Sequence, residues 1–213
     1  NVQAGWQDLL DAIPESAKGA ISTENVAEAT GLSQEEITAG LKEALNKATE
    51  IAIASLAKEG GYLDNPAVKI RMPEELARIE SGLRQIGQEE MADEFVVTMN
   101  QAAEQAVPVA LEQFQSAIDD MSLDDAKGIL NGEDDAATQY FRKHSEASLR
   151  DQFLPIVEEA TANSGVTSTY QSIMNQLGGF SSFLQPKSLD LDAYVTEEAL
   201  NGLFTMVAQE ERR

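Results

Sequence analysis

The chain contains no cysteine, and His144 is the only histidine among its 213 residues. Without cysteine there can be no disulfide, no thiolate metal site and no cysteine nucleophile. One imidazole cannot build a multi-histidine zinc or iron site. The glycine-rich loops that bind phosphates and the G-x-S-x-G nucleophile pattern are also missing. We therefore predict no catalytic residue, no metal site and no cofactor, and we interpret His144 as a structural residue.

Basic residues are scarce, since 15 Lys and Arg stand against 37 Asp and Glu, which gives a formal net charge of -22. Such a charge repels the phosphates of nucleic acids and of anionic lipids, so we exclude nucleic acid as a partner. The interval between Arg84 and Lys127 has no basic residue and many acidic ones. We predict a strongly negative face there. This face is a solvated surface, a binding face for a basic partner, or a weak divalent-cation site.

Glycine and proline are also few, at 14 and 6, and strand-like alternation of apolar and polar residues is nearly absent. Apolar residues recur instead at the three-to-four spacing of helices. The longest apolar run, around residues 51–57, is too short to cross a bilayer, which predicts no membrane-spanning segment. We predict an all-α fold, namely a single-domain orthogonal helical bundle of about eight helices with a kinked central helix. The domain covers residues 1–213, with an N-terminal helical extension at 1–32 and a core at 33–213.

Helix boundaries are marked by local signals. Ser33 and Glu36 have the spacing of a capping box, which predicts a helix that begins there and ends near Gly60. The central helix is expected over about 88–120, with a kink at Pro108 because proline lacks the amide that a helix interior needs.

Three further signals follow in the chain. Ser122 and Asp125 predict another cap, Gly132 suits a left-handed helix stop, and Ser145 suits the cap of the next helix. The apolar spacing then predicts a final helix from about 192 to 211.

Several longer motifs occur in a fixed order. They are GLKEAL from Gly40, GGYLDNPAVKI from Gly60, MNQAAEQAVP from Met99, DAKGILNGEDDAATQYF from Asp125, FLP from Phe153 and YVTEEALNGLFTMVAQEE from Tyr194. In these motifs the chain resembles the bacterial family known as domain of unknown function 4197, from about Leu41 onward. The resemblance implies a helical protein exported to the bacterial envelope, often with a signal peptide or lipoprotein leader. We expect residence in the periplasm or cell envelope, with a leader removed before Asn1. The resemblance implies no catalytic residues.

Six polar residues lie close to the apolar seams of the predicted helices. They are Asn100, Glu104, Asp125, Thr138, Tyr140 and Arg142. Asn100 and Glu104 are one helical turn apart, and we expect the set to converge around Pro108, with Arg142 paired to Glu104 or Asp125. The cluster is either a structural network that fixes helix register or a polar cleft for a small ligand, in which Arg142 recognises an anion. The possible rim of such a cleft is Tyr62, Asn65 and Tyr194.

Function is divided among three hypotheses. The first is a non-catalytic binding or scaffolding protein of the cell envelope, whose partner is an envelope protein or a small ligand. The alternative is a small-ligand carrier or sensor that uses the polar cleft. A carboxylate-dependent hydrolase is the third, and it requires two carboxylates that converge in a pocket, at least one of them with a raised pKa.

Overall fold

The computed structural model describes residues 33–85, 87, 89–163 and 190–212, and the predicted extension at 1–32 lies outside them. Most of these residues are helical and none of them lies in a β-strand, which confirms the predicted all-α class. The elements are α3 (Gln34–Ala57), η2 (Glu74–Leu76), α4 (Ala77–Gln85), α5 (Glu89–Ala106), η3 (Val107–Val109), α6 (Ala110–Asp119), α7 (Leu123–Leu130), α8 (Ala136–Asn163) and α10 (Leu191–Glu211). The expected total of about eight helices is not confirmed by this part of the chain.

Helix α3 begins at the predicted capping box. The Glu36 N–H donates to Ser33 Oγ at 3.2 Å, and the Ser33 N–H donates back to Glu36 Oε2 at 2.8 Å. The helix ends before a tight turn in which Gly60 has a φ of 75°. At Gly61 a Cβ atom would lie 2.3 Å from the carbonyl oxygen of Leu56, so only glycine fits there. The chain can therefore leave α3 sharply and enter the loop that follows.

The segment expected to form one kinked central helix contains two α-helices, α5 and α6, joined by the 3-10 turn η3. The single kinked helix is thus not confirmed. Pro108 occupies the first turn of η3, where its missing N–H is tolerated. Ala102, Ala103 and Ala106 are fully buried on α5. Their small side chains allow α8 to pack closely against α5.

Two predicted boundaries near α8 are wrong. Gly132 does not adopt the left-handed conformation, since only Gly60 and Gly87 have positive φ in the described part of the chain. A Cβ at Gly132 would lie 2.8 Å from the carbonyl oxygen of Gly128, so this glycine permits a close approach. Ser145 does not cap a helix either, because α8 runs through it and buries it. Packing against α5, α6 and α10 stabilises α8 as one continuous helix across that position.

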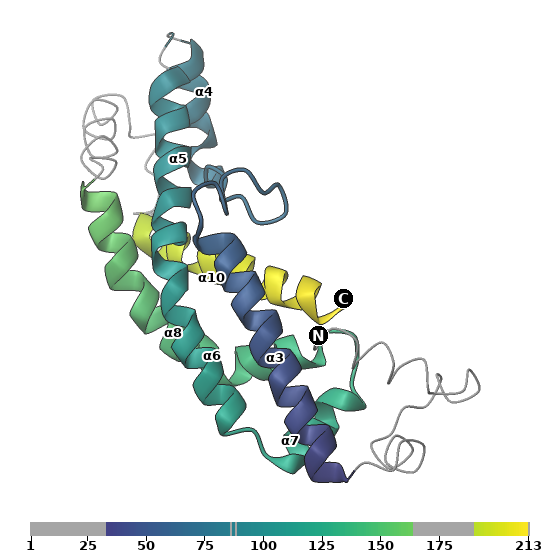
Figure 1. The fold of residues 1–213 in the computed structure, drawn as a ribbon. Coiled ribbons are helices and arrows are strands. Elements are labelled where there is room, and N and C mark those ends of the chain that lie inside the picture. The colour runs from purple at the N-terminus through teal and green to yellow at the C-terminus, as the bar shows by residue number, and fades with distance from the viewer. Residues whose placement is uncertain (1–32, 86, 88, 164–189, 213) are drawn as a thin grey trace.

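The helices pack around one apolar cluster. Figure 1 shows α8 alongside α5 and α6, α10 crossing these helices and α3, and α4 beside the start of α5 at one end. The ring of Phe114 lies 4.8 Å from that of Phe141 and 6.0 Å from that of Phe204, between centroids, so α6, α8 and α10 meet through aromatic side chains. Burial of each such ring contributes roughly 1.5–3 kcal/mol before the loss of conformational entropy is counted.

Candidate functional site

The loop between α3 and η2, residues 60–73, is named here the clasped loop because side chains from α5 hold its backbone. Asn100 Oδ1 accepts the Ile70 N–H at 2.9 Å, and Asn100 Nδ2 donates to the Ile70 carbonyl at 2.8 Å. The side-chain amide thus forms the pair of bonds that a neighbouring strand would form. One turn further along α5, Glu104 Oε1 accepts the N–H groups of Tyr62 at 3.0 Å and Leu63 at 3.3 Å.

Both residues of α5 are buried. Asn100 is 0% exposed and Glu104 is 7% exposed. A buried carboxylate is costly unless hydrogen bonds compensate it, and the two loop amides supply such bonds. The hydroxyl of Tyr62 donates to the Ala199 carbonyl of α10 at 2.7 Å. Burial raises the pKa of Tyr62, and the charge of Glu104 raises it further, so the hydroxyl remains protonated and keeps donating.

Of the predicted rim residues, Tyr62 and Asn65 belong to the clasped loop itself, and Tyr194 contacts it from α10. Asn65 Oδ1 accepts the Ala67 N–H at 3.1 Å, and Asn65 Nδ2 lies 3.5 Å from the sulfur of Met206 on α10. Tyr194, also on α10, donates its hydroxyl to the Arg71 carbonyl at 3.0 Å. The structure therefore brings Tyr194 to the loop that the α5 residues hold, and the side chain of Asn65 is directed to the loop backbone and to α10.

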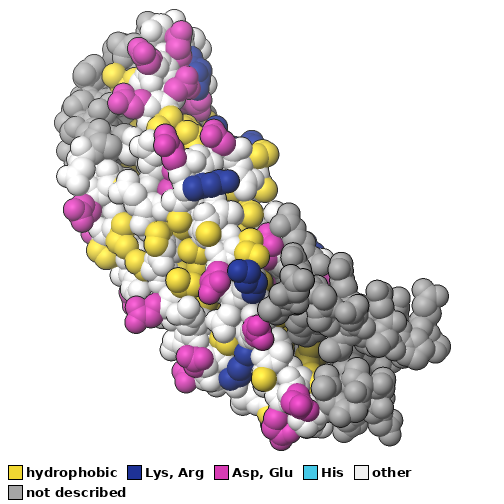
Figure 2. Space-filling view, viewed as in Figure 1, with side chains coloured by type: hydrophobic (Ala, Val, Ile, Leu, Met, Phe, Trp, Pro, Cys, Tyr) yellow, Lys and Arg dark blue, Asp and Glu magenta, His cyan; other side chains and the backbone are white. Residues whose placement is uncertain are grey.

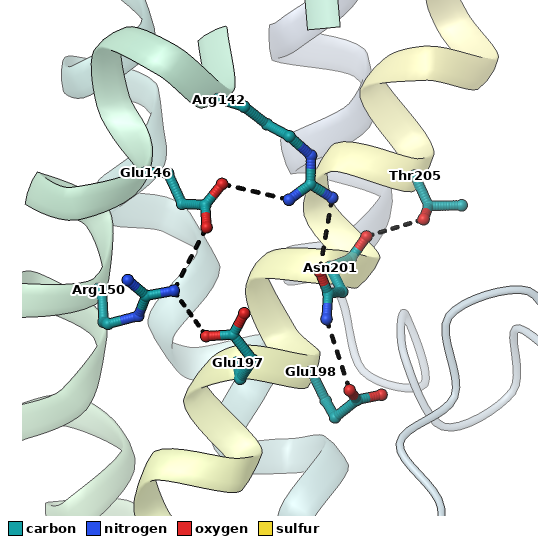
Figure 3. A network of polar contacts seen from close by, with 7 residues as sticks. All are labelled: Arg142, Glu146, Arg150, Glu197, Glu198, Asn201 and Thr205. Carbon is teal, nitrogen blue, oxygen red and sulfur yellow. Dashed lines mark hydrogen bonds and ion pairs between the residues drawn. The ribbon is translucent and has the colours of Figure 1, made fainter. Parts of the chain in front are cut away.

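Arg142 does not join this group, so its expected pairing with Glu104 or Asp125 is wrong. Its guanidinium lies between α8 and α10, where it donates to Glu146 at 3.2 Å and to Asn201 at 3.4 Å (Figure 3). The guanidinium carbon lies 4.4 Å from the centroid of the Phe204 ring. The side chain of Glu146 is one turn along α8, which gives Arg142 a nearer acid than either expected partner.

The contacts of Arg142 continue into a network across α8 and α10 (Figure 3). Arg150 donates to Glu146 at 3.3 Å and to Glu197 at 2.7 Å. The side chains of Arg150 and Glu197 are 46% and 47% exposed. Exposed ion pairs contribute about 0–1 kcal/mol each, so this network aligns the two helices more than it stabilises them.

The remaining expected residues have other partners. Asp125 accepts bonds from the N–H and hydroxyl of Ser122, and these bonds lower its pKa below the usual range. The hydroxyl of Tyr140 donates to the Ala117 carbonyl at 2.8 Å, and burial raises its pKa, as do the charges of Asp125 and Asp120. The expected polar cluster is therefore divided among the clasped loop, the α8 and α10 network and local caps.

Thr138 belongs to a cap that joins the start of α8 to the end of α10. Glu211 of α10 accepts the N–H groups of Ala137 at 2.7 Å and Thr138 at 3.0 Å, and the Thr138 hydroxyl at 2.7 Å. A carboxylate at this position satisfies free amides at the start of α8 and faces the positive end of its dipole. The start of α8 is thus fixed by a residue 73 positions later in the chain.

Comparison with known proteins identifies the family to which the chain belongs. The family model described as protein of unknown function (DUF4197) matches residues 31–213. The chain belongs to this family. No curated protein and no solved structure matched the chain.

In this member of the domain of unknown function 4197 family, the described residues include no group of three or more His, Asp or Glu side chains placed to hold a metal ion. Within the same residues, no helix is both long and apolar enough to cross a membrane. His144 is exposed and stacks on Tyr140, with ring centroids 4.3 Å apart.

Sequence reasoning missed two residues of this family member that hold the site in place. Glu211 gave no local signal, because its partners lie on another helix. Gly202 did give one, since glycine inside a helix needs a packing reason. A Cβ at Gly202 would lie 2.6 Å from Tyr62 Cε1, so the glycine makes room for the tyrosine ring that α10 covers.

Proposed function

We propose that the protein is a non-catalytic binding or scaffolding protein of the bacterial envelope. The observation that carries the proposal is the set of hydrogen bonds that Glu104 accepts. This carboxylate is the buried acid of the expected polar set, and it accepts backbone N–H groups of the clasped loop. A general acid or base must exchange a proton with substrate, whereas an acid used in this way holds a loop in shape.

The other candidate site residues support the same proposal. Asn100, Tyr62 and Tyr140 each direct their polar atoms to backbone groups inside the fold. Among the described residues, the carboxyl groups with shifted pKa values are Glu36 and Asp125. Each is the capping-box partner of a serine whose hydrogen bonds lower its pKa, which is opposite to the shift a general acid needs. A rigid frame with exposed loop side chains suits recognition of a partner.

The envelope location rests on the resemblance described from the sequence motifs. It is tested by fractionating cells that express the full-length gene product, leader included. We expect recovery with the periplasm or the envelope. Recovery in the cytosol contradicts this part of the proposal.

Site-specific photo-crosslinking in the bacterium of origin tests the binding role. A photoreactive amino acid is placed at one exposed position on each of three surfaces, namely Ala67 of the clasped loop, Gln101 of α5 and Glu159 of α8. We expect one discrete envelope-protein adduct from one surface and none from the others. Adducts at no position, together with substrate turnover by the purified protein in a hydrolase panel, would contradict the proposal.

A small-ligand carrier is the second candidate, and the position of Arg142 favours it. Its side chain is 38% exposed and its guanidinium lies over an aromatic ring, an arrangement that can recognise a carboxylate or phosphate. Thermal-shift measurements with a panel of such anions test this function. A shift that Arg142→Ala abolishes and Arg84→Ala retains would support a carrier, because Arg84 is paired on α4 and α5 instead. No shift with any anion would exclude this site.

A further inference from the structure

The tripeptide Leu-Asn-Gly occurs twice in the chain, at residues 130–132 and 200–202. Asparagine is a chemically labile residue, and a following glycine favours its deamidation because glycine has no side chain to shield its backbone nitrogen. The first copy stands at the end of α7, and the second lies inside α10. Their intrinsic reactivity is nearly the same, so a difference between them comes from the fold.

The fold exposes the first copy. Asn131 and Gly132 are both exposed, and Asn131 has already left the helical conformation, with a ψ of 3°. Two hydrogen bonds close the turn. Asn131 Nδ2 donates to the Lys127 carbonyl at 2.8 Å, and the Gly132 N–H donates to the Ile129 carbonyl at 3.1 Å. Water can replace both bonds when this helix end opens.

Helix α7 is itself held by few buried side chains. Of its 8 residues, all of them described, Ala126 is buried, and Ile129 and Leu130 are half-buried. Figure 1 shows α7 at one end of the bundle, beside the start of α3. Elements with little buried surface open locally at low cost in free energy. The backbone at Asn131 can therefore rotate without unfolding of the core.

The second copy is held in place. Gly202 is buried within α10, against the ring of Tyr62. The side chain of Asn201 accepts a hydrogen bond from Arg142 at 3.4 Å and donates one to Glu198 at 3.5 Å (Figure 3). Rotation of the backbone at Asn201 would break the helical ladder in the middle of α10. The fold therefore protects this asparagine.

We propose that Asn131 deamidates spontaneously and that the isoaspartate it forms releases α7 from the bundle. The Gly132 nitrogen gives up its proton to solvent and attacks Asn131 Cγ. A bond forms between these two atoms, and the bond from Cγ to Nδ2 breaks, which releases ammonia and leaves a five-membered succinimide. Water then adds to either carbonyl of that ring and yields aspartate or isoaspartate. The overall change consumes one water and releases one ammonia, with no oxidation or reduction.

Isoaspartate lengthens the main chain by one methylene group between Asn131 and Gly132. The turn has little room for another atom, since a Cβ at Gly132 would lie 2.8 Å from the Gly128 carbonyl oxygen. The new carboxylate also stands at the negative end of α7, next in sequence to Glu133 and Asp134. Figure 2 shows many Asp and Glu side chains on the visible face and few Lys and Arg, so little positive charge offsets this repulsion.

Incubation of the full chain at mildly alkaline pH, followed by tryptic digestion and mass spectrometry, tests the modification. Residues 128–142 and 188–212 are tryptic peptides with one asparagine each. In the folded protein Asn131 should convert at least about tenfold faster than Asn201, which reacts only after α10 opens. In urea both should convert at similar rates. Equal rates in the folded protein, or the same difference in urea, would overturn the inference, as would an Asn131 that converts only in urea.

Hydrogen exchange tests the release of α7. In the incubated protein the amides of α7 should exchange at least about tenfold faster than in fresh protein, while those of α10 stay unchanged. Asn131→Gln is the matched control, because it keeps the amide group but closes a six-membered ring, which forms slowly. After the same incubation this variant should exchange as fresh protein does. Unchanged exchange of α7 after conversion of Asn131, or equal loosening of the glutamine variant, would refute the proposed release.

Discussion

Replacement of Asn100 by alanine should destabilise the protein more than any surface substitution. The change removes the amide that binds both the N–H and the carbonyl of Ile70, a residue that is 1% exposed. Each buried backbone group left without a partner costs roughly 1–3 kcal/mol. The two together should lower the free energy of unfolding by about 4 kcal/mol, out of a total of about 5–15 kcal/mol for a typical domain.

Urea unfolding followed by far-UV circular dichroism measures this loss. With a slope of about 2 kcal/mol per molar urea, the midpoint should fall by about 2 M. Asn131→Ala is the matched control, since the Asn131 amide is exposed and donates to the Lys127 carbonyl. That variant should lose under about 1 kcal/mol.

Hydrogen exchange of the Ile70 amide supplies an independent readout. In wild type this amide is buried and bonded to Asn100, so it should exchange slowly, and in Asn100→Ala it should exchange at the rate of a local opening. The reasoning is refuted if the two asparagine variants lose equal stability. It is also refuted if the Ile70 amide exchanges as slowly in Asn100→Ala as in wild type.

Three further predictions concern the same frame. Glu104→Ala leaves two loop amides without an acceptor and should cost about 2–4 kcal/mol in urea unfolding, and a loss under about 1 kcal/mol would show that the loop is held without it. Gly202→Ala brings a methyl group against the Tyr62 ring and should cost about 1–3 kcal/mol, whereas Gly128→Ala has open space in α7 and should be neutral or stabilising by up to about 1 kcal/mol; equal effects would contradict the packing argument. The pKa of Asp125 is lowered in the folded state, so its contribution is present above the unfolded pKa and is lost as pH falls through the folded value; the melting temperatures of wild type and Asp125→Asn should differ near neutral pH and converge in acid, and a constant gap would contradict this.

The helix starts were largely predictable from the sequence because their signals are local. The capping boxes at Ser33 and Ser122 join residues three positions apart, and both are present in the structure. The final helix was predicted at about 192–211, and α10 spans Leu191–Glu211. The all-α class followed from apolar spacing, which reports how a helix buries one face wherever its partner lies.

The partners of the polar side chains were decided by tertiary structure. Sequence spacing correctly placed Asn100 and Glu104 on one face of a helix, but it could not indicate that the clasped loop would lie against that face. Arg142 was assigned to distant acids, although its partners are Glu146 one turn away and Asn201 on α10. The i,i+4 spacing in the sequence marks Glu146 as a candidate partner, whereas only the packing of α8 on α10 brings Asn201 to the guanidinium.

The sequence by itself therefore determined the all-α class, the capping boxes that start α3 and α7, and the negative charge of the protein, because these depend on residues within a turn of each other or on composition alone. Tertiary structure decided that a buried amide and carboxylate hold a loop, that Glu211 caps α8, and that Ser145 is buried inside a continuous helix. Such pairings depend on which helix faces meet. That choice follows from burial of the whole apolar surface at once, to which each polar contact adds only about 1 kcal/mol.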